Sequence, residues 1–90
     1  MRYLYVKWLH KDPGAPVHLY SEIGDDSYER RKVEIWADGR KGFADGSEEK
    51  GGTVLGSMPV PSLKEIAAQA EFQPKEISAE EFQKMWMKRR

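Results

Sequence analysis

Ninety residues are enough for one domain with a small hydrophobic core, so we expect residues 1–90 to form a single domain. Fifteen basic residues balance fifteen acidic ones, which excludes a chain-wide field that would attract nucleic acid or an anionic membrane. The chain has no cysteine, which excludes disulfides, thiolate catalysis and cysteine-ligated zinc.

The segment Met1–His10 alternates in polarity and carries Arg2 and Lys7, so it lacks the apolar centre of a signal peptide. No apolar run in the chain reaches the ~20 residues that a membrane helix needs. We therefore expect a soluble, cytoplasmic protein without a membrane partner.

Two strands are expected at residues 2–10 and 17–23, because apolar side chains recur there at every second position. Between them, the prolines and glycine of Lys11–Pro16 predict a loop. The side chains predicted to face the core are Leu4, Val6, Trp8, Val17, Leu19 and Ile23. The intervening positions, which include Tyr3, Tyr5 and Tyr20, are predicted to face solvent.

A β-hairpin is expected around Asp38-Gly39, since this pair between two β-prone runs is typical of a tight turn. With a two-residue loop, Ile35 would lie opposite Gly42 and Val33 opposite Ala44. Small residues opposite bulky ones predict that something closely covers this part of the sheet. The same register directs Arg30, Lys32, Glu34 and Trp36 to solvent and places Phe43 beside Trp36.

Residues 45–61 are rich in glycine and proline and are expected to be irregular, with Thr53–Leu55 as a candidate edge strand. Two helices should follow. Ser62 with Glu65 and Ser78 with Glu81 match capping boxes, and each is followed by apolar residues at helical spacing. The first helix is expected to end at Phe72-Gln73-Pro74, and Trp86 of the second is expected to be buried against the sheet.

The order of these elements, strands first and helices last, predicts an α+β fold. The short connections favour an antiparallel meander of four to five strands. We expect both C-terminal helices to pack on one face of that sheet.

No catalytic or metal site is predicted. His10 and His18 lack the repeated spacing of metal ligands, even with Asp12 as a third candidate, and ordinary strand-end histidines are the favoured interpretation. The aspartates and glutamates near glycines are favoured as turn residues, and no phosphate-binding loop or nucleophile motif is present. We therefore expect a protein that is not an enzyme and has no cofactor.

The predicted solvent face of the sheet is the candidate binding site, because it gathers aromatic and charged side chains. Its residues are Tyr5, Tyr20, Tyr28, Arg30, Lys32, Trp36 and Phe43. Cross-strand pairing alone would explain some of these aromatics. Tyrosine, tryptophan and arginine are also the residues enriched at binding hot spots. Both interpretations remain open from the sequence.

Several segments together resemble a family of small bacterial domains, about 90 residues long, whose function is unknown. The resemblance rests on Val6-Lys7-Trp8-Leu9-His10, Leu19-Tyr20-Ser21-Glu22-Ile23, Arg31-Lys32-Val33-Glu34-Ile35-Trp36 with Asp38-Gly39, Leu55-Gly56, Pro59-Val60-Pro61, and Ile77-Ser78 with Glu81-Phe82 and Trp86. It implies no reaction, cofactor or catalytic residue. Small proteins of this kind are often proposed to be immunity proteins.

The function expected from the sequence is a non-enzymatic protein-binding module, with an immunity protein that neutralises a bacterial toxin as its narrower form. The alternative is a single-strand nucleic-acid-binding domain that would use the aromatic and basic sheet face as a stacking platform. Nucleic acid is the less favoured partner because the chain has no net charge.

Overall fold

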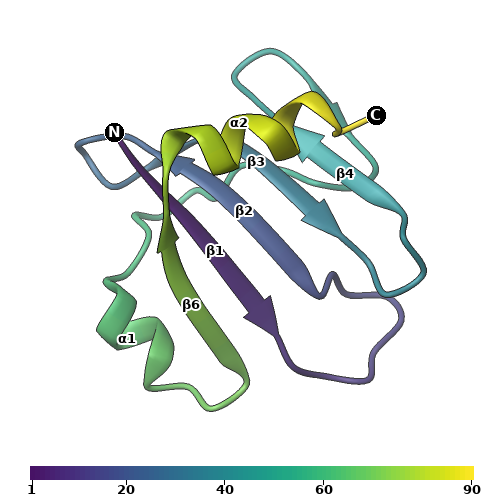
Figure 1. Cartoon of the computed structure of the whole chain (residues 1–90), viewed down its shortest axis with the longest axis horizontal. Coiled ribbons are helices and arrows are strands. Elements are labelled where there is room, and N and C mark those ends of the chain that lie inside the picture. Colours follow the sequence, from purple (N-terminus) through teal and green to yellow (C-terminus); the bar gives the residue numbers. More distant parts are fainter.

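The computed structural model describes residues 1–90 as an α+β fold with one antiparallel sheet. The elements are β1 (Arg2–Trp8), β2 (His18–Ile23), β3 (Glu29–Ile35), β4 (Lys41–Ala44), β5 (Glu49–Lys50), α1 (Leu63–Ala67), β6 (Phe72–Ile77) and α2 (Ala79–Met87). The six strands lie in the order β5-β4-β3-β2-β1-β6, as Figure 1 shows for all but the short β5. Neither helix is long and apolar enough to cross a membrane.

The sheet has six strands instead of the predicted four to five, because residues 72–77 form β6 at the edge beside β1. The expectation that Phe72-Gln73-Pro74 only ends the first helix is wrong in this respect. Phe72 pairs with Trp8 and Ile77 pairs with Tyr3. Hydrogen-bonded pairing with β1, which is distant in the sequence, therefore determines the conformation of residues 72–77. Proline is tolerated at the edge of a sheet, where its missing amide need not donate to a neighbouring strand.

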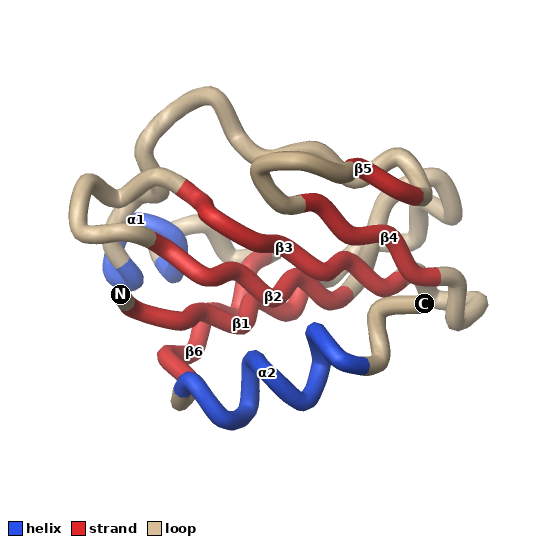
Figure 2. The backbone as a smooth tube through the Cα atoms, turned by 90° about the horizontal axis from the view of Figure 1, so that it is seen from above, coloured by secondary structure: helices blue, strands red, loops and turns tan.

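The two helices pack on opposite faces of the sheet, so the prediction of both on one face is wrong (Figure 2). Leu63 and Ile66, from the helix α1, pack against the cluster that contains Leu4 and Val6. Phe82 and Trp86 of α2 pack on the other side. The edge strand β6 separates the two helices in sequence, and the chain therefore crosses the edge of the sheet before α2 begins. We call these two sides the α1 face and the α2 face.

The hairpin between β3 and β4 has a three-residue loop instead of the predicted two-residue loop. The Trp36 amide donates to the Arg40 carbonyl at 2.9 Å, and Gly39 takes a positive φ of 90°. A glycine at this position is typical of three-residue hairpins. The register therefore moves by one residue, and Val33 lies opposite Phe43. A shift of one residue turns every side chain of a strand to the other face.

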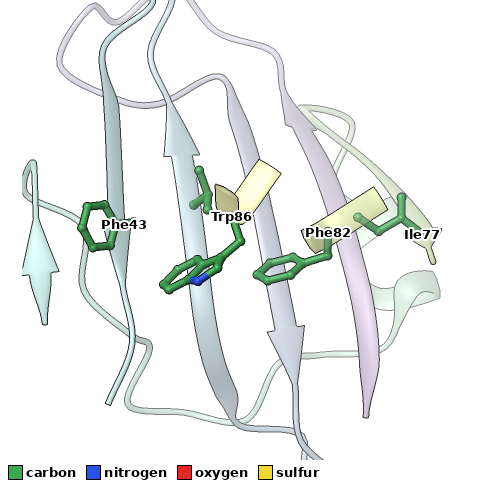
Figure 3. Close-up of a cluster of buried hydrophobic side chains, with 5 residues drawn as sticks. Phe43, Ile77, Phe82 and Trp86 are labelled. Carbon is green, nitrogen blue, oxygen red and sulfur yellow. The ribbon is translucent and has the colours of Figure 1, made fainter. Parts of the chain in front are cut away.

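The α2 face carries a core built from Val33, Phe43, Ile77, Phe82 and Trp86 (Figure 3). Trp86 is 7% exposed, which confirms the prediction that it is buried. Its ring meets the ring of Phe43 edge-on, at 5.7 Å and 85°. Val33 belongs to this core and Ile35 packs against it, as predicted, whereas Leu4 and Val6, which were expected to face the same core, lie on the α1 face.

The segment after β4, which was predicted to be irregular, contains a short strand and a buried side chain. The strand lies at Glu49–Lys50, and Thr53–Leu55 is not a strand. Thr53 is fully buried, and its hydroxyl donates to the Glu34 carboxylate at 2.7 Å. A Cβ added to Gly42 would collide with Thr53, so this small residue is closely covered as predicted, but it lies opposite Glu34 and not opposite Ile35.

Candidate functional site

The open aromatic face predicted from the sequence does not exist, because α2 covers it. Tyr5 and Tyr20 lie half-buried against the α2-face core, with ring centroids 4.9 Å apart, and Phe43 is buried. Burial is the main cause that raises the pKa of both tyrosine hydroxyls, and the charge of Glu81 further raises that of Tyr20. The physical reason is the hairpin register together with the position of α2.

The other predicted site residues are spread over separate places. Arg30 is exposed and pairs with Asp26 at 2.9 Å, which holds the pKa of that carboxyl below its usual range. Trp36 is half-buried, and its indole nitrogen donates to the Gly14 carbonyl at 3.3 Å. Tyr28 is exposed, and Lys32 lies on the α1 face. Lys32 thus lies on the opposite face of the sheet from Tyr5, Tyr20 and Phe43, so the predicted site residues do not share one surface.

The α1 face carries an apolar groove of about 240 Å³, which we call the α1-side groove. It is lined by Leu4, Val6, Leu19, Ser21, Glu29, Lys32, Val60, Pro61, Ile66, Gln69 and Phe72. The strands β1, β2, β3 and β6 supply one part of the lining, and residues 60–69 supply the other. That second part is held by the capping box of Ser62 and by the Val60 amide, which donates to the Ser27 carbonyl at 2.8 Å.

A bulge in the sheet sets the polar lining of this groove. The pairing of β2 with β3 shifts between Glu22 and Ile23, which brings Glu29 opposite Ile23 and leaves Arg30 without a partner residue. An extra residue in one strand reorients the side chains beside it. As a result, Glu29 and Lys32 both line the groove although they are three residues apart.

Three hydrogen-bond donors contact the Glu29 carboxylate. Lys32 donates to it at 3.3 Å and the Ser21 hydroxyl at 3.1 Å, while the Gly56 amide donates at 2.6 Å. The Glu29 and Lys32 side chains are 7% and 15% exposed. Buried charges are tolerated when they are paired and hydrogen-bonded in this way. The groove is therefore an apolar surface with one fixed ion pair, Glu29–Lys32, in its lining. This arrangement is expected of a site that binds and orients a mainly apolar group.

The candidate metal and acid–base residues have ordinary hydrogen-bond partners. One imidazole nitrogen of His10 lies 2.8 Å from the Pro16 carbonyl, and the other accepts from the Asp12 amide at 3.0 Å. His18 lies 2.7 Å from the Tyr5 hydroxyl. No group of three or more histidine, aspartate or glutamate side chains is placed to hold a metal ion.

Sequence reasoning missed the groove because it assigned Leu4, Val6 and Leu19 to a core beneath both helices. One signal pointed elsewhere: the first strand is aromatic or aliphatic on both of its faces, from Tyr3 to Val6. Such a strand is typical of a sheet that is covered on both sides. The sequence contains no comparable signal for the bulge that places Glu29.

Searches of the curated proteins and of the solved structures found no match to the chain. A family model described as "Domain of unknown function (DUF6881)" matches residues 2–90, and the chain therefore belongs to this family.

Proposed function

We propose that this chain is a protein-binding module without catalytic activity, whose partner inserts one apolar side chain into the α1-side groove. The single observation that carries the proposal is the apolar groove with the Glu29–Lys32 pair in its lining. Sites for whole small molecules usually measure about 300–1,000 Å³. A volume of about 240 Å³ fits a protruding side chain better.

Exposed apolar side chains close to the groove support a protein partner. Met58 is 73% exposed and stands two residues before Val60, which lines the groove. The Val60 amide donates to the carbonyl of Ser27, the residue before the exposed Tyr28. Methionine and tyrosine are enriched at protein interfaces, and an interface places such residues around a central pocket.

The nucleic-acid alternative loses its main support. It required an open aromatic face for base stacking, whereas Tyr5, Tyr20 and Phe43 pack beneath α2. We therefore propose no stacking platform for single-stranded nucleic acid.

The test uses variants of the groove in affinity capture from the native host. Gln69→Trp fills the groove from an exposed position, and Ile66→Glu places a charge in it. Met87→Glu is the matched control, because it adds the same charge at an exposed apolar residue of α2. We expect a partner that wild type and Met87→Glu recover and that both groove variants lose. With that partner purified, its affinity for the groove variants should fall at least tenfold.

Circular dichroism and thermal unfolding first establish that each variant folds. Equal recovery of every captured protein by folded Gln69→Trp and by wild type would place the interface away from the groove. The narrower hypothesis, an immunity protein, makes a further prediction. Co-expression of wild type should rescue cells from a toxic partner, and co-expression of Gln69→Trp should not.

A further inference from the structure

Basic side chains from three distant parts of the chain surround a hollow of about 560 Å³ at the β4–β5 end of the sheet. It is lined by Gly39, Lys41, Phe43, Lys50, Arg89 and Arg90, and we call it the basic hollow. Figures 1 and 2 both show the C-terminal end of the chain beside β4. The hollow shares no lining residue with the α1-side groove, so the two sites can be tested independently.

Three of these cations are held in place by the protein. The Arg89 guanidinium lies over the rings of Trp86 and Phe43, at 4.2 and 5.0 Å, and donates to the Trp86 carbonyl at 2.8 Å. Arg90 lies 5.2 Å from the centre of the Phe43 ring. Lys41 donates to the Lys88 carbonyl at 2.8 Å. Side chains fixed in this way lose little further conformational freedom when a ligand binds.

The charges around the hollow are not balanced. Glu48 pairs with Arg90 at 2.9 Å, and the charge of Arg89 helps to lower the pKa of the nearby Asp45 carboxyl, but Lys41, Lys50 and Arg89 form no direct ion pair. Helix C-termini attract basic residues, which accounts for Arg89, Arg90 and the contact of Lys41. That effect does not explain Lys50, which lies on β5. In addition, Arg89 Nε is buried without a hydrogen-bond partner, which is rare for a donor in a folded protein.

The basic side chains around the hollow indicate which kind of ligand it can bind. A phosphate monoester carries close to two negative charges and several acceptor oxygens, which match a group of guanidinium and ammonium donors. A long polyanion fits less well, because Glu48 and Glu49 stand next to the cations and the chain has no net charge. The Phe43 ring is covered by both arginines and is not free to stack on a base. We propose that the basic hollow binds one phosphoryl group of a small phosphorylated ligand.

The experiment measures binding of inorganic phosphate, a nucleoside monophosphate and a short oligothymidylate by calorimetry and amide NMR, at constant ionic strength. The test variant is Lys50→Gln with Arg90→Gln. The matched control, Lys64→Gln with Lys75→Gln, removes the same charge at exposed residues elsewhere. We expect saturable phosphate binding that shifts the amides of Gly39, Phe43 and Lys50. The affinity should fall at least tenfold in the test variant and less than twofold in the control.

The arms also identify the source of the phosphoryl group. A small ligand is supported by two results together. The nucleoside monophosphate should bind with higher affinity than inorganic phosphate, and the oligothymidylate should not bind with higher affinity per phosphate group than the nucleoside monophosphate. Oligonucleotide affinity that falls steeply with salt would assign the site to nucleic acid and overturn the small-ligand proposal. Phosphate binding that is equal in wild type and both double variants would mean an adventitious ion only. Absence of saturable binding would likewise overturn the proposal.

Discussion

At the scale of single residues, Gly42 and Thr53 lie in close contact on the α1 face. The Thr53 side chain lies where a Cβ of residue 42 would stand, and it hydrogen-bonds to Glu34. The backbone of the segment after β5 can approach the sheet this closely only because residue 42 has no side chain.

Gly42→Ala should therefore lower the free energy of unfolding by about 1–3 kcal/mol, the usual cost of inserting a methyl group into a packed site. Gly46→Ala is the control, because a Cβ there would meet no atom within 4 Å. Urea denaturation of both variants measures the difference. Equal midpoints for the two would show that Thr53 moves aside without cost.

At the scale of elements, the packing of α2 on the sheet forms the larger of the two hydrophobic cores. Its capping box at Ser78 starts the helix, and Phe82 and Trp86 on one of its sides complete the α2 face. From the sheet, the Arg31 guanidinium lies 5.0 Å from the ring of Phe82 and 4.9 Å from that of Trp86. The helix is therefore held by both aromatic burial and a cation over its rings.

Trp86→Ala should lower the free energy of unfolding by about 3–5 kcal/mol, as usual when a buried aromatic site is emptied. Trp36→Ala provides the comparison, because Trp36 is half-buried at the hairpin and lies outside the α2 core. It should destabilise clearly less. Thermal and urea unfolding of both variants give the measurement, and equal losses would mean that α2 adds little to the stability of the fold.

At the scale of the whole molecule, an ion pair on the α2 face joins two central strands beneath the helix. Two donors of the Arg31 guanidinium contact the two oxygens of the Glu22 carboxylate, both at 2.8 Å. Hydrogen bonding from Arg31 is the main cause that holds the pKa of Glu22 below its usual range. Arg31 also donates to Gln83 on α2 at 3.3 Å, so this pair connects sheet and helix.

The lowered pKa makes stability depend on pH. A carboxyl whose pKa is lower in the folded state stabilises the fold above its unfolded pKa of about 4.3. The contribution is lost as the pH falls through the folded pKa. Glu22→Gln should lower the free energy of unfolding by about 1.5–3 kcal/mol at neutral pH, the usual contribution of a hydrogen bond to a charged group. The difference from wild type should shrink in acid, because protonated Glu22 resembles glutamine.

Urea denaturation at a series of pH values compares wild type, Glu22→Gln and the exposed control Glu76→Gln. A difference between wild type and Glu22→Gln that stays constant down to about pH 2 would show that the Glu22 charge does not contribute. Direct comparison is needed because the pKa values of Asp26, Asp38 and Asp45 are also lowered, so Glu22 is not the only carboxyl whose folded pKa departs from its usual range.

The sequence by itself determined the features that depend on neighbouring residues. The capping boxes at Ser62 and Ser78 are local hydrogen-bond patterns, and both are present. The hairpin at Asp38-Gly39 and the burial of Trp86 follow from turn chemistry and helical periodicity, which also act over a few residues. The α+β class and the antiparallel sheet followed from these elements and their order.

Only the tertiary structure decided which side chains share a face. One additional loop residue placed Phe43 opposite Val33 in the α2 core, and a bulge brought Glu29 beside Lys32. Pairing with β1 made a strand of residues 72–77 and so sent the helices to opposite faces. The basic hollow likewise joins Lys41 of β4, Lys50 of β5 and Arg90, which follows α2. The physical reason is that strand register and edge pairing depend on contacts between distant segments, whereas alternation along one strand leaves open which of its two faces lies under which helix.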